Sequence, residues 1–107
     1  MVKKTVPKKI IKLVSDYKKL IKKNDISVSQ VILFGSYAKN LYRSSSDIDV
    51  CVVSKNCNDE FDMQVKLSKL TIDLDTRIEP HPVSFSDYIT NANPFISEIR
   101  KTGIKIA

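Results

Sequence analysis

The sequence contains no hydrophobic run that approaches the ~20 residues needed to span a bilayer, so it predicts no transmembrane helix. Its first residues are basic, but no apolar h-region follows them. We therefore see no secretory signal and expect a cytoplasmic protein. Internal repeats, linkers and low-complexity tracts are also missing, apart from the lysines near the start. The 107 residues predict a single domain, 1–107, with one hydrophobic core.

Cysteine and histidine are scarce, which limits the chemistry available to the chain. Cys51 and Cys57 lie six positions apart and offer too few ligands for a zinc site. Because disulfides are rare in cytosolic proteins, we expect two free thiols. His81 is the only histidine. Two interpretations of it stay open: a surface residue between two prolines, which we favour, or a group that touches a phosphate or relays a proton.

Acidic residues are nearly absent from the first 23 positions. That segment holds nine lysines against Asp16 alone, a net charge of +8, so the other 84 residues carry −2 of the total of +6. Such a segment could attract an acidic partner, nucleic acid or a triphosphate, or it could be a solvated helix face. Binding to nucleic acid would weaken steeply with salt. We expect neither a nucleic-acid partner nor a membrane partner.

Hydrophobic periodicity predicts an alternation of helices and strands. Apolar residues recur at helical spacing between residues 8 and 23, and the continuous apolar run at 30–34 is typical of a strand covered on both faces. The full prediction comprises helices at 8–23, 59–74 and 94–101, a short helix at 86–88, one or two helical turns at 37–41, and strands at 30–34, 47–54, 76–84 and 104–106.

This order of elements indicates an α/β or α+β domain, a small mixed β-sheet with helices packed on it. Only residues 36–46 connect the first two strands, which is short for a parallel crossover, so we expect these neighbours to be antiparallel or mixed. Pro80 and Pro82 would interrupt a fully paired strand, and they place the third strand at an edge of the sheet.

Two of the predicted helices carry expectations about the core. Asn58 is the expected N-cap of the helix at 59–74, because acidic residues follow it in the first turn. The expected core stripe of that helix consists of Phe61, Val65, Leu67, Leu70 and Leu74. Core packing is one interpretation of Phe95, Ile96 and Ile99 in the last helix.

Residues 31–50, VILFGSYAKNLYRSSSDIDV, place polar groups between two apolar strands. Gly35 and Ser36 follow the first strand, where glycine lets a ligand approach the backbone, and where exposed N–H groups and a hydroxyl favour phosphate. Asp47 and Asp49 open the second strand, and at this spacing their side chains leave the same face. Paired carboxylates are typical ligands of Mg²⁺. Acids that merely face water are the alternative, because each motif alone is a weak signal.

The combination of the two motifs is far more specific. Gly35-Ser36-Tyr37-Ala38, followed by Ser46-Asp47-Ile48-Asp49-Val50, resembles the signature of the nucleotidyltransferase superfamily related to DNA polymerase β. In so short a chain it is most similar to the minimal nucleotidyltransferases, the MNT proteins. The match is close over residues 31–53, and the order of elements agrees loosely over the remainder. The resemblance implies a polymerase β-like nucleotidyltransferase core.

The resemblance also implies roles for individual residues. Gly35 and Ser36 would hold the β and γ phosphates of a nucleotide, and Asp47 and Asp49 would bind Mg²⁺, with two ions expected. The superfamily uses a third carboxylate on a neighbouring strand, and Glu79 is the natural candidate for it.

Asp75 is the reserve choice for the third carboxylate, and an exposed acid on an edge strand is the alternative interpretation of Glu79. Two positions depart from the superfamily pattern. Asn40 stands where glycine is usual, and asparagine is the next-best residue for a left-handed backbone conformation. Lys39, a candidate nucleotide-binding residue, stands where arginine is frequent, so it keeps the charge but loses the bidentate geometry.

By the same resemblance, the expected activity is Mg²⁺-dependent transfer of AMP from ATP to a hydroxyl. Asp47, Asp49 and Glu79 would be the catalytic and metal-binding residues. Relatives are commonly paired with a ribonuclease toxin of the HEPN class, so the expected partner is a HEPN toxin in a hetero-oligomer, modified on a tyrosine, with this chain as the antitoxin. The same analogy implies that Phe95, Ile96 and Ile99 could form part of the partner surface, with core packing as the equal alternative. The alternative is a catalytically weak or inactive binding module that neutralises its partner by forming a complex.

Overall fold

The structure, a computed structural model, describes residues 6–43 and 45–106. This part of the chain forms four helices and four strands. Their bounds are α1 (Lys8–Lys23), β1 (Gln30–Phe34), β2 (Ile48–Ser54), α2 (Glu60–Ile72), β3 (Ile78–Ser84), α3 (Phe85–Thr90), α4 (Pro94–Thr102) and β4 (Ile104–Ile106).

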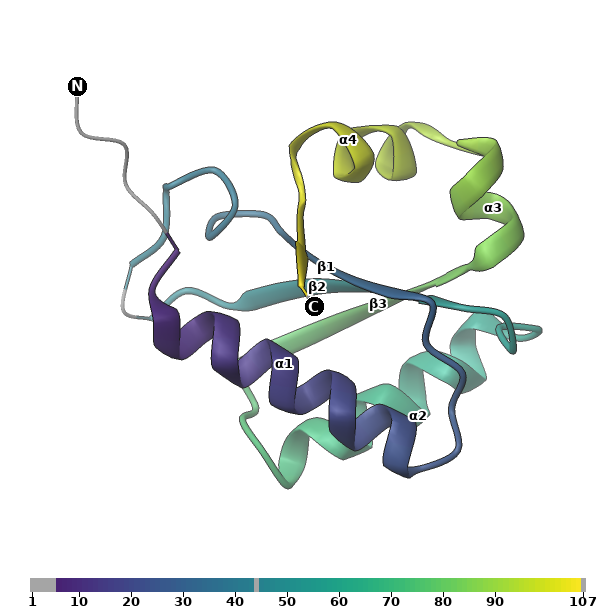
Figure 1. The fold of residues 1–107 in the computed structure, drawn as a ribbon, viewed down its shortest axis with the longest axis horizontal. Coiled ribbons are helices and arrows are strands. Elements are labelled where there is room, and N and C mark those ends of the chain that lie inside the picture. The colour runs from purple at the N-terminus through teal and green to yellow at the C-terminus, as the bar shows by residue number, and fades with distance from the viewer. Residues whose placement is uncertain (1–5, 44, 107) are drawn as a thin grey trace.

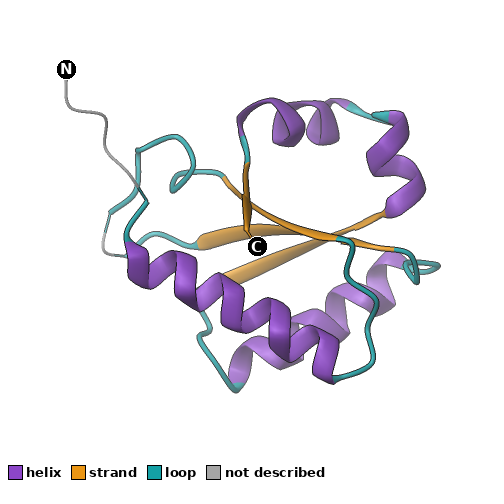
Figure 2. Ribbon diagram, in the orientation of Figure 1, coloured by secondary structure: helices purple, strands orange, loops and turns teal. Residues whose placement is uncertain are grey.

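The strands form one mixed sheet in the order β3-β2-β1-β4. β1 is antiparallel to β2 and to β4, whereas β2 and β3 run parallel through the crossover helix α2. The sheet lies between two layers of helices, with α1 and α2 on one face and α3 and α4 on the other (Figures 1 and 2). This arrangement confirms the predicted small mixed sheet, and β3 is an edge strand as its prolines indicated.

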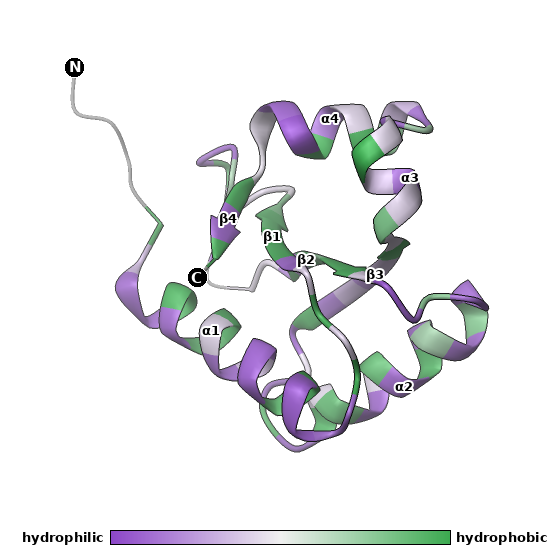
Figure 3. Cartoon of the chain, turned by 45° about the vertical axis from the view of Figure 1, so that its right-hand side comes forward, coloured by the Kyte–Doolittle hydropathy of each residue, from purple (hydrophilic) through white to green (hydrophobic). Residues whose placement is uncertain are grey.

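Side chains of the two central strands alternate between two hydrophobic clusters. Val31, Leu33 and Val50 pack with α1 and α2, whereas Ile32 and Cys51 pack with α3 and α4. Both faces of β1 and β2 are therefore covered, which explains why these strands read as continuous apolar runs. In Figure 3 hydrophobic residues run through both strands, while α1 alternates between hydrophobic and hydrophilic bands.

The helices largely confirm the predicted ranges, whereas the core stripe expected for α2 is confirmed only at Leu67, Leu70 and Leu74, which pack into the core. Phe61 is 78% exposed and Val65 is also exposed, and the buried residues of α2 are Met63, Leu67 and Thr71. Helical spacing alone allows either face of α2 to be the inner one, and packing under α1 and β3 selects Leu67 and its neighbours. The N-cap is Asp59, whose side chain accepts a hydrogen bond from the N–H of Asp62, and not Asn58.

The end of the chain resolves the other open expectation. Ile96 and Ile99 are buried in the cluster under α3 and α4, whereas Phe95 is 41% exposed. α3 begins at Phe85, earlier than predicted, because the side chain of Ser84 caps it by accepting from the N–H of Asp87. Cys51 and Cys57 are free thiols, as expected.

The connection after β1 is a set of hydrogen-bonded turns, not the predicted helical turns at 37–41. The N–H of Lys39 donates to the carbonyl oxygen of Gly35 (3.1 Å), and that of Leu41 to Ser36 (2.9 Å). Asn40 has φ +60°, so asparagine does adopt the left-handed conformation at this position. Among the described residues, no helix is both long and apolar enough to cross a membrane.

Candidate functional site

The acidic residues of the candidate site come from two neighbouring strands. Asp49 of β2 lies directly beside Glu79 of β3 in the parallel register, and Phe34 of β1 lies on its other side. Because side chains alternate along a strand, Asp49 shares its face with Cys51, which packs against α3 and α4. Asp49 and Glu79 are therefore at the end of this face, one pair beyond the part that the helices cover.

His81 joins the two carboxylates. One ligand atom each of Asp49, Glu79 and His81 lie within 4.8 Å of one another. The Nε2 atom of His81 is 3.6 Å from Oδ1 of Asp49, and it is buried without a hydrogen bond to any described residue. A buried imidazole nitrogen that faces a carboxylate and lacks its own partner is suited to bind an additional group.

Gly35 packs directly against this cluster. Its φ is +72°, a left-handed conformation that side chains disfavour. A Cβ atom placed on Gly35 would overlap Oδ2 of Asp49. The glycine therefore serves two purposes, since it allows the sharp turn after β1 and keeps space beside the carboxylate.

The remaining predicted site residues lie around this centre at different depths. Asp47 is exposed, precedes β2 by one residue and is outside the 4.8 Å group. Ser36 is half-buried in the turn after Gly35. Nζ of Lys39 is 3.8 Å from Oε1 of Glu98 in α4, and both side chains are about half exposed. The structure thus brings Gly35 and Asp49 together, with Glu79, and leaves Asp47 at the rim.

Asp75, the reserve candidate, has a different partner. Its carboxylate accepts hydrogen bonds from the guanidinium of Arg77, the shortest at 2.8 Å, in the turn before β3. These bonds, opposed by partial burial, lower the pKa of Asp75 below its ordinary value. The geometry therefore favours Glu79 over Asp75 as the third carboxylate.

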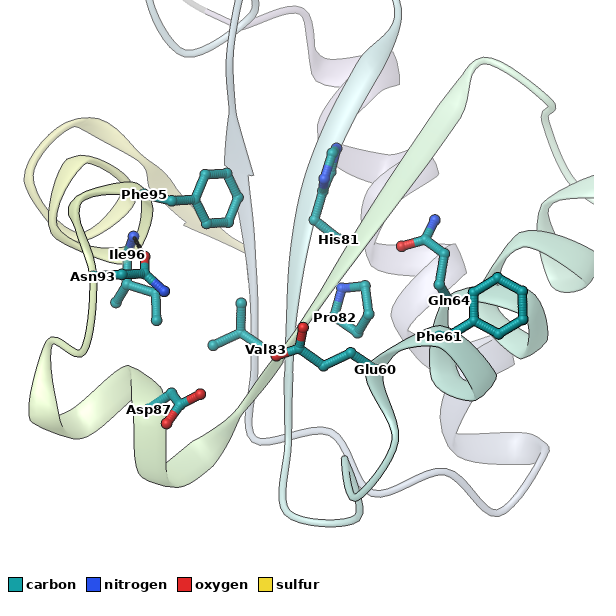
Figure 4. A pocket seen from close by; sticks show the side chains of 10 residues that line it. All are labelled: Glu60, Phe61, Gln64, His81, Pro82, Val83, Asp87, Asn93, Phe95 and Ile96. Carbon is teal, nitrogen blue, oxygen red and sulfur yellow. Dashed lines mark hydrogen bonds between the residues drawn. The ribbon is translucent and has the colours of Figure 1, made fainter.

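Two hollows flank the centre. One, of about 250 Å³, is bounded by Gly35, Lys39 and Glu98. The other, of about 360 Å³, is lined by His81, Glu60 and Asp87, among others (Figure 4).

An aromatic cluster of Phe34, His81 and Phe95 lies between the two hollows. The ring of Phe34 makes edge contacts with His81 and Phe95, at centroid distances of 5.1 and 5.4 Å. Phe95 lines both hollows. The cluster gives the site an apolar floor on which His81 is held beside Asp49.

The donor set fits a divalent cation. Carboxylates of Asp49 and Glu79 are the oxygen ligands that Mg²⁺ prefers, usually together with phosphate oxygens. The unpartnered Nε2 of His81 and the space kept open by Gly35 both fit an ion at this position. Carboxylate oxygens also suit Mn²⁺, and the imidazole nitrogen additionally suits Zn²⁺.

Sequence reasoning undervalued His81. The favoured interpretation placed it on the surface between two prolines, and its side chain is 37% exposed, but it also contacts Asp49. The available signal was its spacing from Glu79, because residues two apart on one strand share a face. What the sequence did not reveal was the register that sets β3 beside β2.

Comparisons with known proteins agree with this geometry. A family profile described as nucleotidyltransferase domain matches residues 8–107. No curated protein sequence matches significantly.

Among solved structures, a candidate nucleotidyltransferase from Sulfolobus solfataricus superposes with a TM-score of 0.65 at 18% identity, over 91% of this chain and 78% of that one. A toxin–antitoxin structure with AMP-PNP gives 0.60 at 22% identity, over 91% and 72%. A complex of tri-AMPylated Shewanella oneidensis HEPN toxin with its MNT antitoxin gives 0.57 at 20% identity, over 92% and 71%. At these identities the likeness shows the fold.

Proposed function

Because this chain belongs to the nucleotidyltransferase family, we propose that it transfers AMP from ATP to a hydroxyl group of a partner protein. The observation that carries the proposal is the placement of Asp49 beside Glu79, with Gly35 packed against the Asp49 carboxylate. Paired carboxylates next to a glycine corner suit a metal-bound triphosphate.

In the proposed reaction, Asp47, Asp49 and Glu79 hold Mg²⁺, with two ions expected. Bound Mg²⁺ would supply positive charge to the transferring phosphate and the leaving pyrophosphate. The acceptor oxygen forms a bond to the α-phosphorus of ATP, and the bond from that phosphorus to the bridging oxygen breaks. Pyrophosphate leaves, and Glu79 would accept the proton of the acceptor hydroxyl.

Gly35, Ser36 and Lys39 are the proposed nucleotide-binding residues. Gly35 and Lys39, both in the turn after β1, border one hollow, and Ser36 lies between them in the chain. In this proposal the backbone N–H of the glycine corner and the Ser36 hydroxyl would donate to phosphate oxygens. Lys39 borders the same hollow and contributes positive charge once it exchanges Glu98 for a phosphate. Its ion pair with Glu98 is exposed, so breaking it costs little.

The proposed partner is a HEPN toxin that is modified on a tyrosine and held in a hetero-oligomer, with this chain as the antitoxin. Its support is the fold shared with the MNT antitoxin that accompanies a tri-AMPylated HEPN toxin. We place this reaction in the cytoplasm, where ATP is available and thiols such as Cys51 and Cys57 stay reduced.

The test is incubation of the purified chain with ATP labelled at the α-phosphate, Mg²⁺ and a HEPN partner. We expect label on the partner, loss of that label in Asp49→Asn and Glu79→Gln, and its retention in Asp75→Asn. Transfer that survives both of the first two substitutions would overturn the assignment of the site.

A non-catalytic binding module is the second candidate, and the position of Asp47 favours it. Asp47 is exposed and outside the group formed by Asp49, Glu79 and His81. A tight complex with the partner, no label transfer at any Mg²⁺ concentration, and no effect of Asp49→Asn on the complex would select this reading.

A further inference from the structure

The hollow beside His81 differs in charge from the one beside Lys39. Figure 4 shows Glu60 of α2 and Asp87 of α3 directing their carboxylates into the space between these helices and β3. Its lining contains two carboxylates, those of Glu60 and Asp87, and neither lysine nor arginine. The hollow is therefore an acidic cavity at the open edge of β3, adjacent to the candidate site.

The negative charges of this hollow also affect a nearby thiol. Cys57 has a raised pKa, caused first by burial and then by the negative charges of Glu60, Asp87 and Asp59. These acids therefore act on a group outside the hollow as well as on its interior. Negative charge repels a triphosphate, so this hollow is unsuited to the nucleotide phosphates, whereas the hollow with Lys39 is suited to them.

Aromatic groups complete the lining. Phe61 is 78% exposed at one side of the hollow, and Phe95 is 41% exposed at the other. Exposed aromatic rings beside carboxylates favour side chains that are cationic, aromatic or both. Phe61 makes little contribution to the core, so its exposed ring is available to contact a ligand in the hollow.

The position of His81 connects the hollow to the proposed chemistry. Its ring lines the hollow, while its Nε2 atom is 3.6 Å from Oδ1 of Asp49. An acceptor side chain that occupies this hollow beside His81 would therefore lie next to the residue that contacts Asp49. The nucleotide in the Lys39 hollow and the acceptor in this one would then occupy two separate hollows that share only Phe95 in their linings.

We propose that this acidic hollow is the acceptor subsite, and that it takes a segment of the acceptor protein in which a basic side chain lies next to the hydroxyl-bearing residue. This inference rests on the proposed function, because it names the substrate surface for the same reaction. Glu60 and Asp87 attract the basic side chain, Phe61 and Phe95 contact its apolar part, and His81 guides the hydroxyl towards Asp49.

The test uses two capped tripeptides as probes, Arg-Tyr-Arg and Glu-Tyr-Glu, titrated into the ¹⁵N-labelled chain without ATP. Arg-Tyr-Arg should shift the amide signals of Phe61, Val83 and Phe95, and Glu-Tyr-Glu should not. In the double variant Glu60→Gln/Asp87→Asn, binding of Arg-Tyr-Arg should weaken between about 2-fold and 30-fold, the range for two exposed charge pairs.

A matched control carries the same change in charge elsewhere. Asp16→Asn/Asp73→Asn removes two acids from the α1 and α2 side, and it should leave Arg-Tyr-Arg binding unchanged. Glu60 is exposed, so Glu60→Gln alone keeps the test valid should Asp87→Asn disturb α3. Equal binding of both peptides, or equal weakening in the two double variants, overturns the acceptor subsite.

The two proposals fail separately. Transfer of AMP to a protein acceptor with the same KM for that acceptor in wild type and Glu60→Gln/Asp87→Asn would refute the subsite and leave the nucleotidyltransferase function standing. Selective binding of Arg-Tyr-Arg by a chain that transfers no label would refute the transfer reaction and leave the acidic hollow as a docking site.

Discussion

Gly35 and Asp49 are packed so closely that a single added carbon on the glycine would coincide with a carboxylate oxygen of the aspartate. The two residues come from either side of a connection of more than ten residues, yet β1 and β2 pair so that Phe34 is opposite Asp49. The antiparallel register therefore brings the turn that follows β1 onto the acid of β2. The glycine is needed both for its backbone conformation and for the space that it leaves.

Gly35→Ala should weaken metal binding and lower stability. The side chain would be strained at φ +72°, at a cost of about 1–3 kcal/mol, and would push the Asp49 carboxylate away. Mn²⁺ binding followed by electron paramagnetic resonance, together with urea unfolding, measures both effects. Asn91→Ala is the control, because Asn91 also has a positive φ (+56°) but lies at the end of α3; it should lose stability and keep its Mn²⁺ affinity.

Asp49→Asn and Glu79→Gln should each reduce AMP transfer by at least about a hundredfold, because metal charge stabilisation is worth several kcal/mol. Both should also weaken Mn²⁺ binding, which is measured without ATP. Asp75→Asn removes an equal charge a few residues from Glu79 and should bind Mn²⁺ as the wild type does. Loss of Mn²⁺ binding in Asp75→Asn, with binding retained in Glu79→Gln, would show that Asp75 is the third carboxylate.

The ion pair between Asp75 and Arg77 should make a small, pH-dependent contribution to stability. Arg77 lowers the pKa of Asp75 in the folded state below its ordinary 3.8. The contribution is therefore present above pH 3.8 and is lost as the pH falls through the lower folded pKa. For a partly exposed pair it amounts to ~1 kcal/mol at most. Urea unfolding of wild type and Asp75→Asn should differ at pH 6 and converge at low pH; a difference that grows as the pH falls would contradict this.

The two thiols should differ in reactivity. Burial raises the pKa of Cys51 to about 12, and its side chain is fully buried. In the native protein at pH 8, Cys51 should not react with a thiol reagent, whereas Cys57 should react slowly; Cys57→Ser should abolish the native reaction. Because the folded pKa of Cys51 is raised, its contribution to stability is complete below pH ~9 and declines as the pH rises towards 12. Native reaction of the Cys57→Ser variant at pH 8 would contradict the burial of Cys51.

The two faces of α2 should respond oppositely to truncation. Leu67 is fully buried beneath α1, where the hydroxyl of Tyr17 donates to its carbonyl oxygen (2.7 Å). Leu67→Ala should cost about 2–5 kcal/mol of unfolding free energy. Phe61→Ala removes a larger side chain from an exposed position and should change stability by no more than about 0.5 kcal/mol. Urea unfolding distinguishes the two, and a large loss in Phe61→Ala would restore the core stripe predicted from the sequence.

Local sequence patterns predicted most of the fold. The bounds of α1, β1 and β4 follow directly from hydrophobic periodicity and from the residues that end each element. The short connection between β1 and β2 excluded a parallel pair, and two prolines placed β3 at the edge. These features depend on covalent geometry and on neighbours close in sequence, which is why the chain alone reveals them.

What the sequence by itself determined was the inventory of the site: a glycine–serine corner, two aspartates at strand spacing and one further acid in a proline-flanked strand. Only the tertiary structure decided which of these groups meet. The parallel register of β2 and β3 sets Glu79 beside Asp49 and brings His81 next to both. Asp75 instead forms an ion pair with Arg77, and Asp47 remains exposed outside this group. Packing likewise decided that Leu67 is buried in the core and that Phe61 is exposed. Such choices depend on contacts between residues distant in the chain, and spacing along one strand or helix cannot specify them.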